Sequence, residues 1–260
     1  MAAHVNASVV AIAGIAGLPI GSFLTVVVHR VPAGESVVAP GSRCPACGTA
    51  IRAVDNVPVL SFLLRRGRCR TCGAAISLRY PATELATALL FSAVASRLPS
   101  PWDVPAYCVL VAGLVALGAI DIAHFRLPTP VVVATLAVGA PLLVLASAKT
   151  HAWSSLVHAG VAGVACFAAF ALLYAAARRA MGYGDVRLAG LCGVFLGWLG
   201  YRVALVGVLL GVLAAGAAAV ALLASGRAGR KTRLPFGPFL AVGTVAAVLF
   251  GPSIARFWLG

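Results

Sequence analysis

The sequence predicts an all-α polytopic membrane protein of about eight transmembrane helices, with a small cytoplasmic four-cysteine, zinc-binding loop domain. The first observation behind this is composition, because 62% of the 260 residues are hydrophobic and only 10% are charged. The second is a mean hydropathy of +1.03, well above that of a soluble globular domain. The third is a pair of CxxC motifs in the single long polar segment.

The predicted helices come from counting apolar stretches, because a membrane-spanning helix needs about 20 predominantly apolar residues. Arg30 follows the first stretch instead of preceding it, which is the wrong flank for a secretory signal peptide. We therefore expect a retained helix with its N-terminus outside. The eight stretches cover approximately residues 5–28, 82–98, 104–121, 129–147, 154–177, 186–200, 203–225 and 236–256.

The net charge of +14 is unevenly distributed along the chain. Sixteen of the 20 Lys and Arg residues fall in the first, third, fifth and seventh loops between the stretches, if Arg187, the second residue of the stretch 186–200, is counted with the fifth loop. This asymmetry matches the positive-inside rule and predicts that these loops are cytoplasmic. The basic charge is thus explained by topology and by contact with anionic membrane lipid, and no nucleic-acid partner is expected.

The segment 30–81 is the only loop long enough to form a small soluble unit. Its motifs CPACG and CRTCG supply Cys44, Cys47, Cys69 and Cys72, with 21 residues between the pairs. This spacing is typical of a tetrahedral four-cysteine zinc site, and a structural metal would help a loop of roughly 50 residues to fold. The predicted division is a first transmembrane helix (1–29), a cysteine-rich domain (30–81) and a transmembrane catalytic domain (82–260).

The cysteines also allow two disulfides or a redox pair, but a cytoplasmic loop lies in a reducing compartment, which disfavours disulfides. The remaining cysteines, Cys108, Cys166 and Cys192, lie within apolar stretches. We interpret these three as small core residues.

Asp121 and Asp185 are the acidic residues that stand out among the six in the chain. Asp121 ends the third apolar stretch, in GAIDIAHFRLP, and Asp185 opens the sixth, in MGYGDVRL. An ionisable group at the membrane boundary is costly and is a functional candidate. The alternative is that each caps a helix or pairs with the neighbouring Arg126 or Arg187. Asp103, in the turn PSPWD, is expected only to bond local backbone.

Gly182 and Gly184 precede Asp185 and would permit close backbone approach and an unusual turn in an active-site loop. Two carboxylates brought together cannot both ionise cheaply, so one can hold a proton while the other acts as a base towards water. Neither spacing nor periodicity shows that the two side chains meet.

Four segments carry a resemblance that covers almost the whole chain. GSFLTVVVHRVP is similar to the GSFLNVVIYRLP of type IV prepilin peptidases, and CPACGTAIRAVDNVPVLSFLLRRGRCRTCGAAISLRYPATEL resembles their cysteine region. GYGDVRL resembles the GxGD element that this family shares with presenilin-type peptidases, and LPFGPFLAVG resembles a further family element. The joint occurrence of these segments with an upstream ID…LP element is specific.

The resemblance implies a catalytic dyad of Asp121 and Asp185 in an enzyme of the bacterial inner membrane. It implies cleavage of the basic leader of type IV prepilins or type II secretion pseudopilins, after a glycine at the cytoplasmic edge of the substrate's apolar helix. For members that retain the cysteine region, it also implies N-methylation of the new N-terminus from S-adenosylmethionine, although no glycine-rich nucleotide fingerprint is visible. A transporter with two aspartates as a proton relay is the non-enzymatic alternative.

The chain departs from the family pattern at four positions. Ala123 and Thr129 replace acids of the family's IDxDHxxLPD, Arg187 replaces lysine, and Thr25 replaces asparagine. Asp121 is therefore the only carboxylate available in its segment.

Glu84 is expected to lie near a helix N-terminus, where the dipole favours a carboxylate, and the alternative is a polar group near the active face. His29, Arg30 and His124 could contact the substrate or the carboxylates, but their interfacial location explains each of them equally well. Gly207 forms a GxxxG spacing that predicts tight helix packing.

Overall fold

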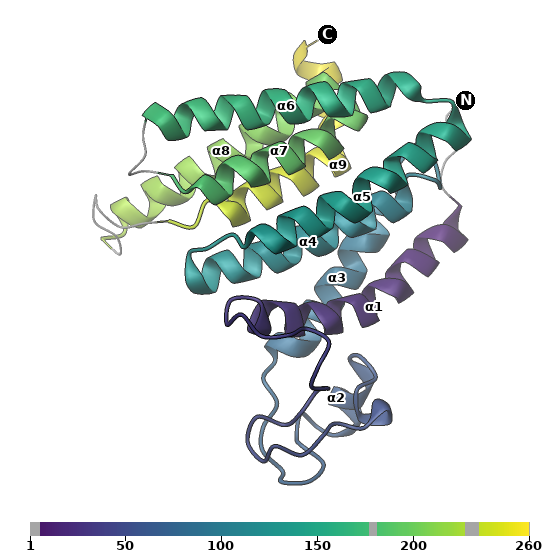
Figure 1. Ribbon diagram of the computed structural model, residues 1–260, viewed down its shortest axis with the longest axis vertical. Helices are drawn as coiled ribbons and strands as arrows, with labels where there is room; N and C mark the ends of the chain where they lie inside the picture. The colour runs from purple at the N-terminus through teal and green to yellow at the C-terminus, as the bar shows by residue number, and fades with distance from the viewer. Residues whose placement is uncertain (1–5, 177–180, 227–233, 260) are drawn as a thin grey trace.

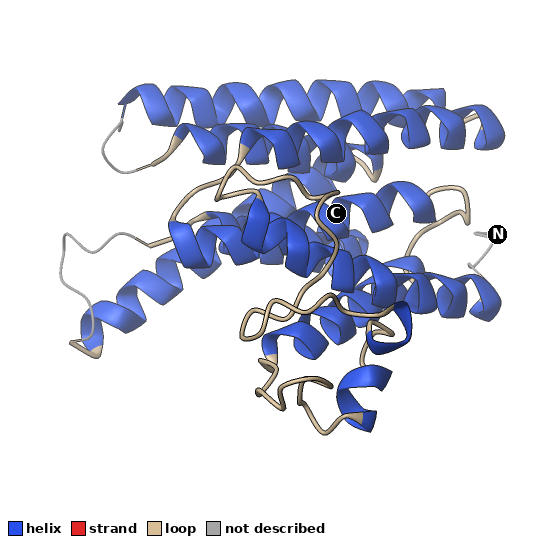
Figure 2. Ribbon diagram, turned by 60° about the horizontal axis from the view of Figure 1, so that its bottom comes forward, coloured by secondary structure: helices blue, strands red, loops and turns tan. Residues whose placement is uncertain are grey.

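The computed structural model describes residues 6–176, 181–226 and 234–259, and these residues are almost entirely helical (Figure 2). Each of the eight predicted stretches coincides with one long helix. Most basic residues of the fifth and seventh predicted loops lie outside the described residues. The long helices are α1 (Ala7–Arg30), α3 (Arg79–Ala95), α4 (Val104–His124), α5 (Thr129–Thr150), α6 (Trp153–Ala176), α7 (Tyr183–Trp198), α8 (Tyr201–Ala224) and α9 (Gly237–Leu259).

Five of the described helices, α1, α4, α5, α6 and α8, are long and apolar enough to cross a membrane. Two others are shorter, since α3 has 17 residues and α7 has 16. The apolar part of α9 is Gly237–Gly251. The chain is thus a multi-pass helical membrane protein, with short helices packed among the long ones.

The cysteine loop between α1 and α3 contains a 3-10 turn, η1 (Ala53–Asp55), and a short helix, α2 (Leu60–Leu64). Figure 1 shows this loop below α1 and α3, on the side facing away from α6, α7, α8 and α9. Most of the loop therefore lies on the α1–α3 side of the molecule, while Val37 packs against the cluster that contains Ala116 of α4.

Glycine lets neighbouring helices approach closely in two places. A Cβ added at Gly17 of α1 would lie 2.5 Å from the Cα of Ala88 in α3. A Cβ added at Gly243 of α9 would lie 2.4 Å from the backbone nitrogen of Gly211 in α8. Such distances exclude any side chain, so the packing predicted for the GxxxG pair Gly207 and Gly211 is confirmed.

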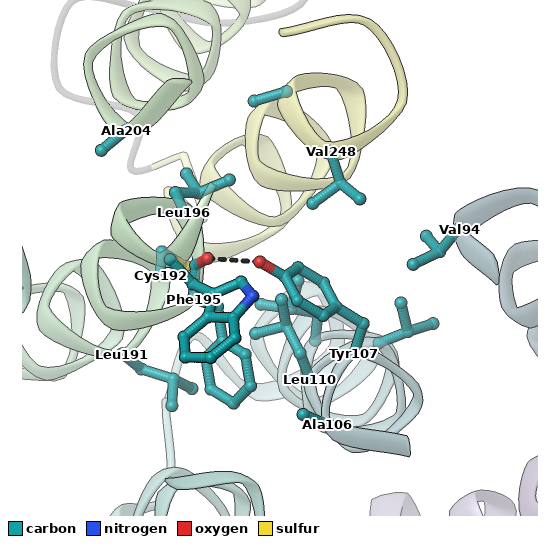
Figure 3. Close-up of a cluster of buried hydrophobic side chains, with 14 of the residues drawn as sticks. Val94, Ala106, Tyr107, Leu110, Leu191, Cys192, Phe195, Leu196, Ala204 and Val248 are labelled. Carbon is teal, nitrogen blue, oxygen red and sulfur yellow. Dashed lines mark hydrogen bonds between the residues drawn. The ribbon is translucent and has the colours of Figure 1, made fainter. Parts of the chain in front are cut away.

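The core is centred on α4, where Tyr107 is fully buried. Its hydroxyl donates a 2.6 Å hydrogen bond to the carbonyl oxygen of Phe195 in α7, and the two rings meet edge to face (Figure 3). The bond satisfies a phenol that would otherwise be costly to bury. It also joins the two helices that carry Asp121 and Asp185, at the end opposite to those residues.

Asp103 bonds the local backbone at Ser100, as its position in the turn predicts, but it is also buried. It immediately precedes α4 and is only 2% exposed, and its Oδ1 has no hydrogen-bond partner among the described residues. Burial raises the pKa of its carboxyl group to about 6, although the Ser100 backbone and the Trp198 side chain provide hydrogen bonds that act in the opposite direction. Asp103 is thus a buried acid in the turn directly before α4.

Candidate active site

Asp121 lies in the last turn of α4 and is 5% exposed. The helix ends four residues later at Phe125, whose left-handed backbone (φ 53°) lets its N–H bond to the Asp121 carbonyl oxygen. The Asp121 Oδ2 atom accepts a 3.0 Å hydrogen bond from the N–H of Gly237, the first residue of α9. The carboxylate therefore binds the electropositive start of a helix more than 100 residues away.

Asp185 is the third residue of α7 and is 7% exposed. Its Oδ2 accepts a 3.0 Å hydrogen bond from the N–H of Gly182, which precedes the helix. Gly182 has an ordinary extended backbone (φ −85°) and Gly184 lies within α7. The unusual turn expected at these two glycines is therefore not what the structure shows.

The expected close approach does occur at Gly184. A Cβ added there would lie 2.8 Å from the Cβ of Leu127, which follows α4. A Cβ added at Gly237 would lie 2.8 Å from Asp121 Oδ2 and 3.0 Å from Leu127 Cδ2. Leu127 thus contacts the starts of both α7 and α9 and brings the segments carrying Asp121 and Asp185 together.

Sequence reasoning missed Leu127 and Gly237 as parts of this site. Both lie in segments that were noted, ID…LP and LPFGPF, but nothing in one sequence indicates which glycine donates to which carboxylate. The sequence signal that could have identified Gly237 is the Gly-Pro pair at 237–238, since proline is favoured in the first turn of a helix. That pair identifies a helix start, and a helix start attracts a carboxylate.

Asp121 and Asp185 are close enough to interact electrostatically. Neither forms an ion pair with Arg126 or Arg187, because all salt bridges among the described residues involve Asp55. The part of the alternative in which each aspartate pairs with a neighbouring arginine is therefore wrong. The part in which an aspartate caps a helix is confirmed for Asp185, which bonds the N–H of Gly182 before α7. When two buried carboxylates repel each other, one keeps its proton while the other ionises. The first can then act as an acid and the second as a base.

Arg187 takes a different partner. Its Nη1 contacts the hydroxyl of Thr129 at the start of α5, and its guanidinium lies 5.1 Å from the centre of the Tyr183 ring. Two departures from the family pattern, Arg187 and Thr129, are therefore in contact. Together they join α7 to the segment that carries Leu127.

The four cysteines of the loop lie together, as their spacing predicts. Their sulfur atoms are all within 4.8 Å of one another, and the Cys44 and Cys72 sulfurs are 3.9 Å apart. Ligands on a tetrahedral zinc ion at 2.3 Å would be about 3.8 Å apart. All seven cysteines of the chain are free, so the disulfide alternative is not what the structure shows.

The two cysteine motifs form matching knuckles. Gly48 donates a 2.8 Å backbone bond to Cys44, and Gly73 donates a 3.0 Å bond to Cys69. Both glycines have φ of +70°, which glycine adopts without strain. The repeated CxxCG sequence thus builds the same turn twice and directs four thiols to one point.

Glu84 is the sixth residue of α3 and is 7% exposed. Its Oε2 accepts a 2.7 Å hydrogen bond from the N–H of Val59 in the cysteine loop. Val59 has a positive φ of 60°, which is unusual for a β-branched residue. Glu84 therefore fastens the loop to α3, a role that the helix-dipole interpretation did not predict.

Comparison with known proteins fits this geometry. Residues 15–98 match a family model described as the bacterial peptidase A24 N-terminal domain, and residues 108–224 match the type IV leader peptidase family. A prepilin leader peptidase/N-methyltransferase of Pseudomonas aeruginosa is 35% identical, over 94% of this chain and 91% of its own length. The chain belongs to the type IV leader peptidase family.

Other relatives in this peptidase family carry the same name. That of Bacillus subtilis is 34% identical over 94% of this chain and 95% of its own length. That of Aeromonas hydrophila is 35% identical over 93% of this chain and 91% of its own length. No solved structure matches the chain.

Proposed function

We propose that this chain is a membrane aspartyl endopeptidase with Asp121 and Asp185 as its catalytic dyad. The observation that carries the proposal is that two buried carboxylates, from α4 and α7, lie on segments that Leu127 brings together through its contacts at Gly184 and Gly237. Its proposed substrates are type IV prepilins or type II secretion pseudopilins, and the relatives, which are named prepilin leader peptidases, support the prepilin part of this assignment. The enzyme removes the basic leader of such a substrate.

The hydrogen bonds at the dyad support different roles for the two oxygen atoms of each carboxyl group. Gly237 and Gly182 each bond one oxygen, Oδ2, of Asp121 and Asp185 respectively. The second oxygen of each group remains available for water or substrate. The ionised carboxyl takes a proton from a water molecule, and this water attacks the scissile carbonyl. The protonated carboxyl donates its proton to the carbonyl oxygen. Return of a proton to the departing amine completes cleavage.

The dyad and the cysteine loop face the cytoplasm in this proposal, in a bacterial inner membrane. The loop leaves the end of α1 that holds Arg30, and the charge distribution along the sequence supports a cytoplasmic position for it. Membrane lipid surrounds the helices, and the apolar helix of the substrate enters from the bilayer. No nucleic acid takes part.

Cys44, Cys47, Cys69 and Cys72 hold a structural zinc ion in this proposal. The donor set fits, because four thiol sulfurs within 4.8 Å of one another match a tetrahedral site. The ion would link the two knuckles of the 30–81 domain, which lies between the first transmembrane helix (1–29) and the catalytic domain (82–260).

N-methylation of the new N-terminus is the second proposed activity, with S-adenosylmethionine as the methyl donor. It is supported by the relatives, which are named as N-methyltransferases as well as leader peptidases. Their similarity covers the cysteine loop, since the alignments span 93–94% of this chain.

Cleavage of a purified prepilin substrate, followed by mass spectrometry, tests the dyad. We expect Asp121→Asn and Asp185→Asn each to lower the rate by about 10²–10⁴-fold, the usual contribution of a general acid or base. Asp103→Asn is the matched control, because Asp103 is equally buried but adjoins the opposite end of α4. Cleavage at the normal rate in either dyad variant would refute the proposal.

A further inference from the structure

The cysteine loop encloses a cavity of ≈ 940 Å³ against α1 and the start of α3. That volume is within the range of about 300–1,000 Å³ found for small-molecule sites. All of its lining residues belong to α1, the cysteine loop or α3. The cavity is therefore separate from the dyad, which is built on α4, α7 and α9.

The lining of this cavity is strongly basic, with six arginines and two acids. Both acids already have partners, since Asp55 is paired with Arg65 and Arg70 and Glu84 accepts the hydrogen bond from Val59. The remaining positive charge favours an anionic ligand. The six arginines are Arg30, Arg43, Arg52, Arg65, Arg68 and Arg70.

Two of these arginines occupy equivalent positions in the two cysteine knuckles. Arg43 directly precedes Cys44, and Arg68 directly precedes Cys69. Each arginine pairs with an alanine across its own knuckle in an antiparallel bridge. The Cys44 and Cys69 sulfurs lie within 4.8 Å of each other, so the two arginines start from neighbouring points of the cavity lining.

Both guanidinium groups keep most of their hydrogen-bond donors. The side chain of Arg43 forms no hydrogen bond or ion pair within the described part of the chain. That of Arg68 donates one bond, of 3.4 Å, to the carbonyl oxygen of Gly73. A guanidinium carries five N–H donors in a planar fork that matches phosphate. Two neighbouring arginines with free donors are therefore suited to a phosphate group.

The other part of the lining is mostly apolar and lies on α1, a helix long and apolar enough to cross a membrane. The lining follows α1 from Pro19 to Arg30, a length of about 16 Å at about 1.5 Å per residue. That is roughly half of the hydrocarbon thickness of a bilayer, about 30 Å. Phe23 and Val26 lie along this path, and Phe23 is 48% exposed. The cavity is thus basic at its loop end and apolar along α1.

This combination of charge and apolar surface distinguishes among the candidate ligands. A free phosphate or a nucleotide would satisfy the arginines but would leave the apolar part of α1 uncovered. A basic leader peptide would be repelled by the arginines. A phospholipid with a net negative charge has both of the required parts, a phosphodiester and an acyl chain.

We propose that this cavity binds one anionic phospholipid, with its phosphodiester between Arg43 and Arg68 and an acyl chain along α1 towards Pro19. The lipid offsets part of the basic charge and attaches the cysteine loop to the membrane-spanning part of α1. It adds a third attachment to the four-cysteine cluster and the Glu84–Val59 bond. The site is independent of the proposed peptidase and methyl-transfer activities.

Native mass spectrometry of the purified full chain in detergent measures this binding. Phosphatidylglycerol is compared with phosphatidylethanolamine of the same acyl chains, whose amine cancels the charge of its phosphate. We expect phosphatidylglycerol to bind at least about tenfold more tightly. Arg43→Gln combined with Arg68→Gln should weaken phosphatidylglycerol binding by at least about 30-fold, because each change removes a charge-assisted hydrogen bond.

Arg66→Gln combined with Arg79→Gln is the matched control. It removes the same charge from exposed positions of segment 30–81 that do not line the cavity, so binding should change by less than about threefold. The zinc content of both double variants shows whether the loop remains folded. Phe23→Ala keeps all six arginines and shortens the apolar lining, so it should weaken phosphatidylglycerol binding by about fivefold.

Phosphatidylglycerol with a photoreactive acyl chain locates the lipid on the wild-type chain. We expect cross-links within residues 19–30 of α1, lost in the cavity double variant and kept in its control. Equal weakening by the two double variants, equal binding of the two lipids, or cross-links only to other helices would overturn the site. Displacement of the lipid by an equal concentration of glycerol 3-phosphate would show that the phosphate alone is recognised, which would overturn the lipid assignment.

Discussion

The candidate active site and the cysteine loop are built in opposite ways. Asp121 and Asp185 are positioned by long helices, whose packing is fixed by glycine contacts and by the Tyr107–Phe195 bond. No Phe, Leu or Ile side chain of the loop is buried, including those of Phe62, Leu63 and Leu64. The loop has two cysteine knuckles and the Glu84–Val59 bond instead. The positions of the two aspartates thus depend on helix packing, whereas we propose that the loop depends on a bound zinc ion and on the Glu84–Val59 bond.

The largest effect is expected when the proposed zinc ion is removed from the cysteine loop. Replacing Cys44 and Cys47 by Ser should abolish zinc binding, which contributes about 10–16 kcal/mol to folding in small zinc domains. We expect limited proteolysis to cut within 30–81 while the helices stay intact and retain the dyad. Elemental analysis should find about one zinc per wild-type chain.

Cys108→Ser and Cys166→Ser form the matched control, because these cysteines lie in α4 and α6, away from the cluster. If the wild-type protein contains no zinc, or if the double loop variant resists protease as well as the wild type does, the metal does not hold the loop together.

The candidate active site, which the long helices form, should instead be disrupted by a change in side-chain packing. Gly237→Val would place a Cβ 2.8 Å from Asp121 Oδ2 and 3.0 Å from Leu127, so the carboxylate must move. We expect cleavage to fall by about 10²-fold, a typical loss for a misplaced catalytic group. The loop should be unaffected, as judged by its zinc content.

Gly216→Val is the control for this change, because a Cβ added at Gly216 of α8 meets nothing within 4 Å. Equal cleavage by the Gly237 and Gly216 variants would show that the Gly237 contact does not position Asp121.

The same difference explains how much could be predicted from the sequence. The eight helices followed from hydropathy, and the four-cysteine cluster followed from CxxC spacing, because both signals are local. The contact of Gly237 with Asp121 joins residues 116 positions apart, and the Glu84–Val59 bond joins a helix to a loop. No local pattern encodes such pairs, and the burial of Asp103 depends on the packing around α4.

A smaller effect is expected at Asp103, which tests the stability of the helices away from the dyad. Its pKa is raised to about 6 by burial, so the folded state holds this proton more tightly than the unfolded state. Stability therefore falls as pH rises from about 4 to about 6 and stays lowered above that. Asp103→Asn should gain on the order of 1–2 kcal/mol at pH 8 and little at pH 4, measured by thermal unfolding.

Asp55→Asn, in the cysteine loop, is the contrasting variant because it removes salt bridges. A stability difference between Asp103→Asn and the wild type that does not change with pH would contradict the assignment of a raised pKa to Asp103.

The smallest expected effect concerns Arg187 and Thr129, whose contact joins α7 to the start of α5 beside Leu127. Thr129→Val keeps the shape of the side chain and removes the acceptor, which should cost about 1 kcal/mol, or roughly fivefold in cleavage. Thr150→Val, at the other end of α5, is the matched control, because Thr150 bonds only to its own helix. A double-mutant cycle with Arg187→Met separates the contact from the individual side chains. Additive effects would mean that Arg187 acts on the dyad through Tyr183 and not through Thr129.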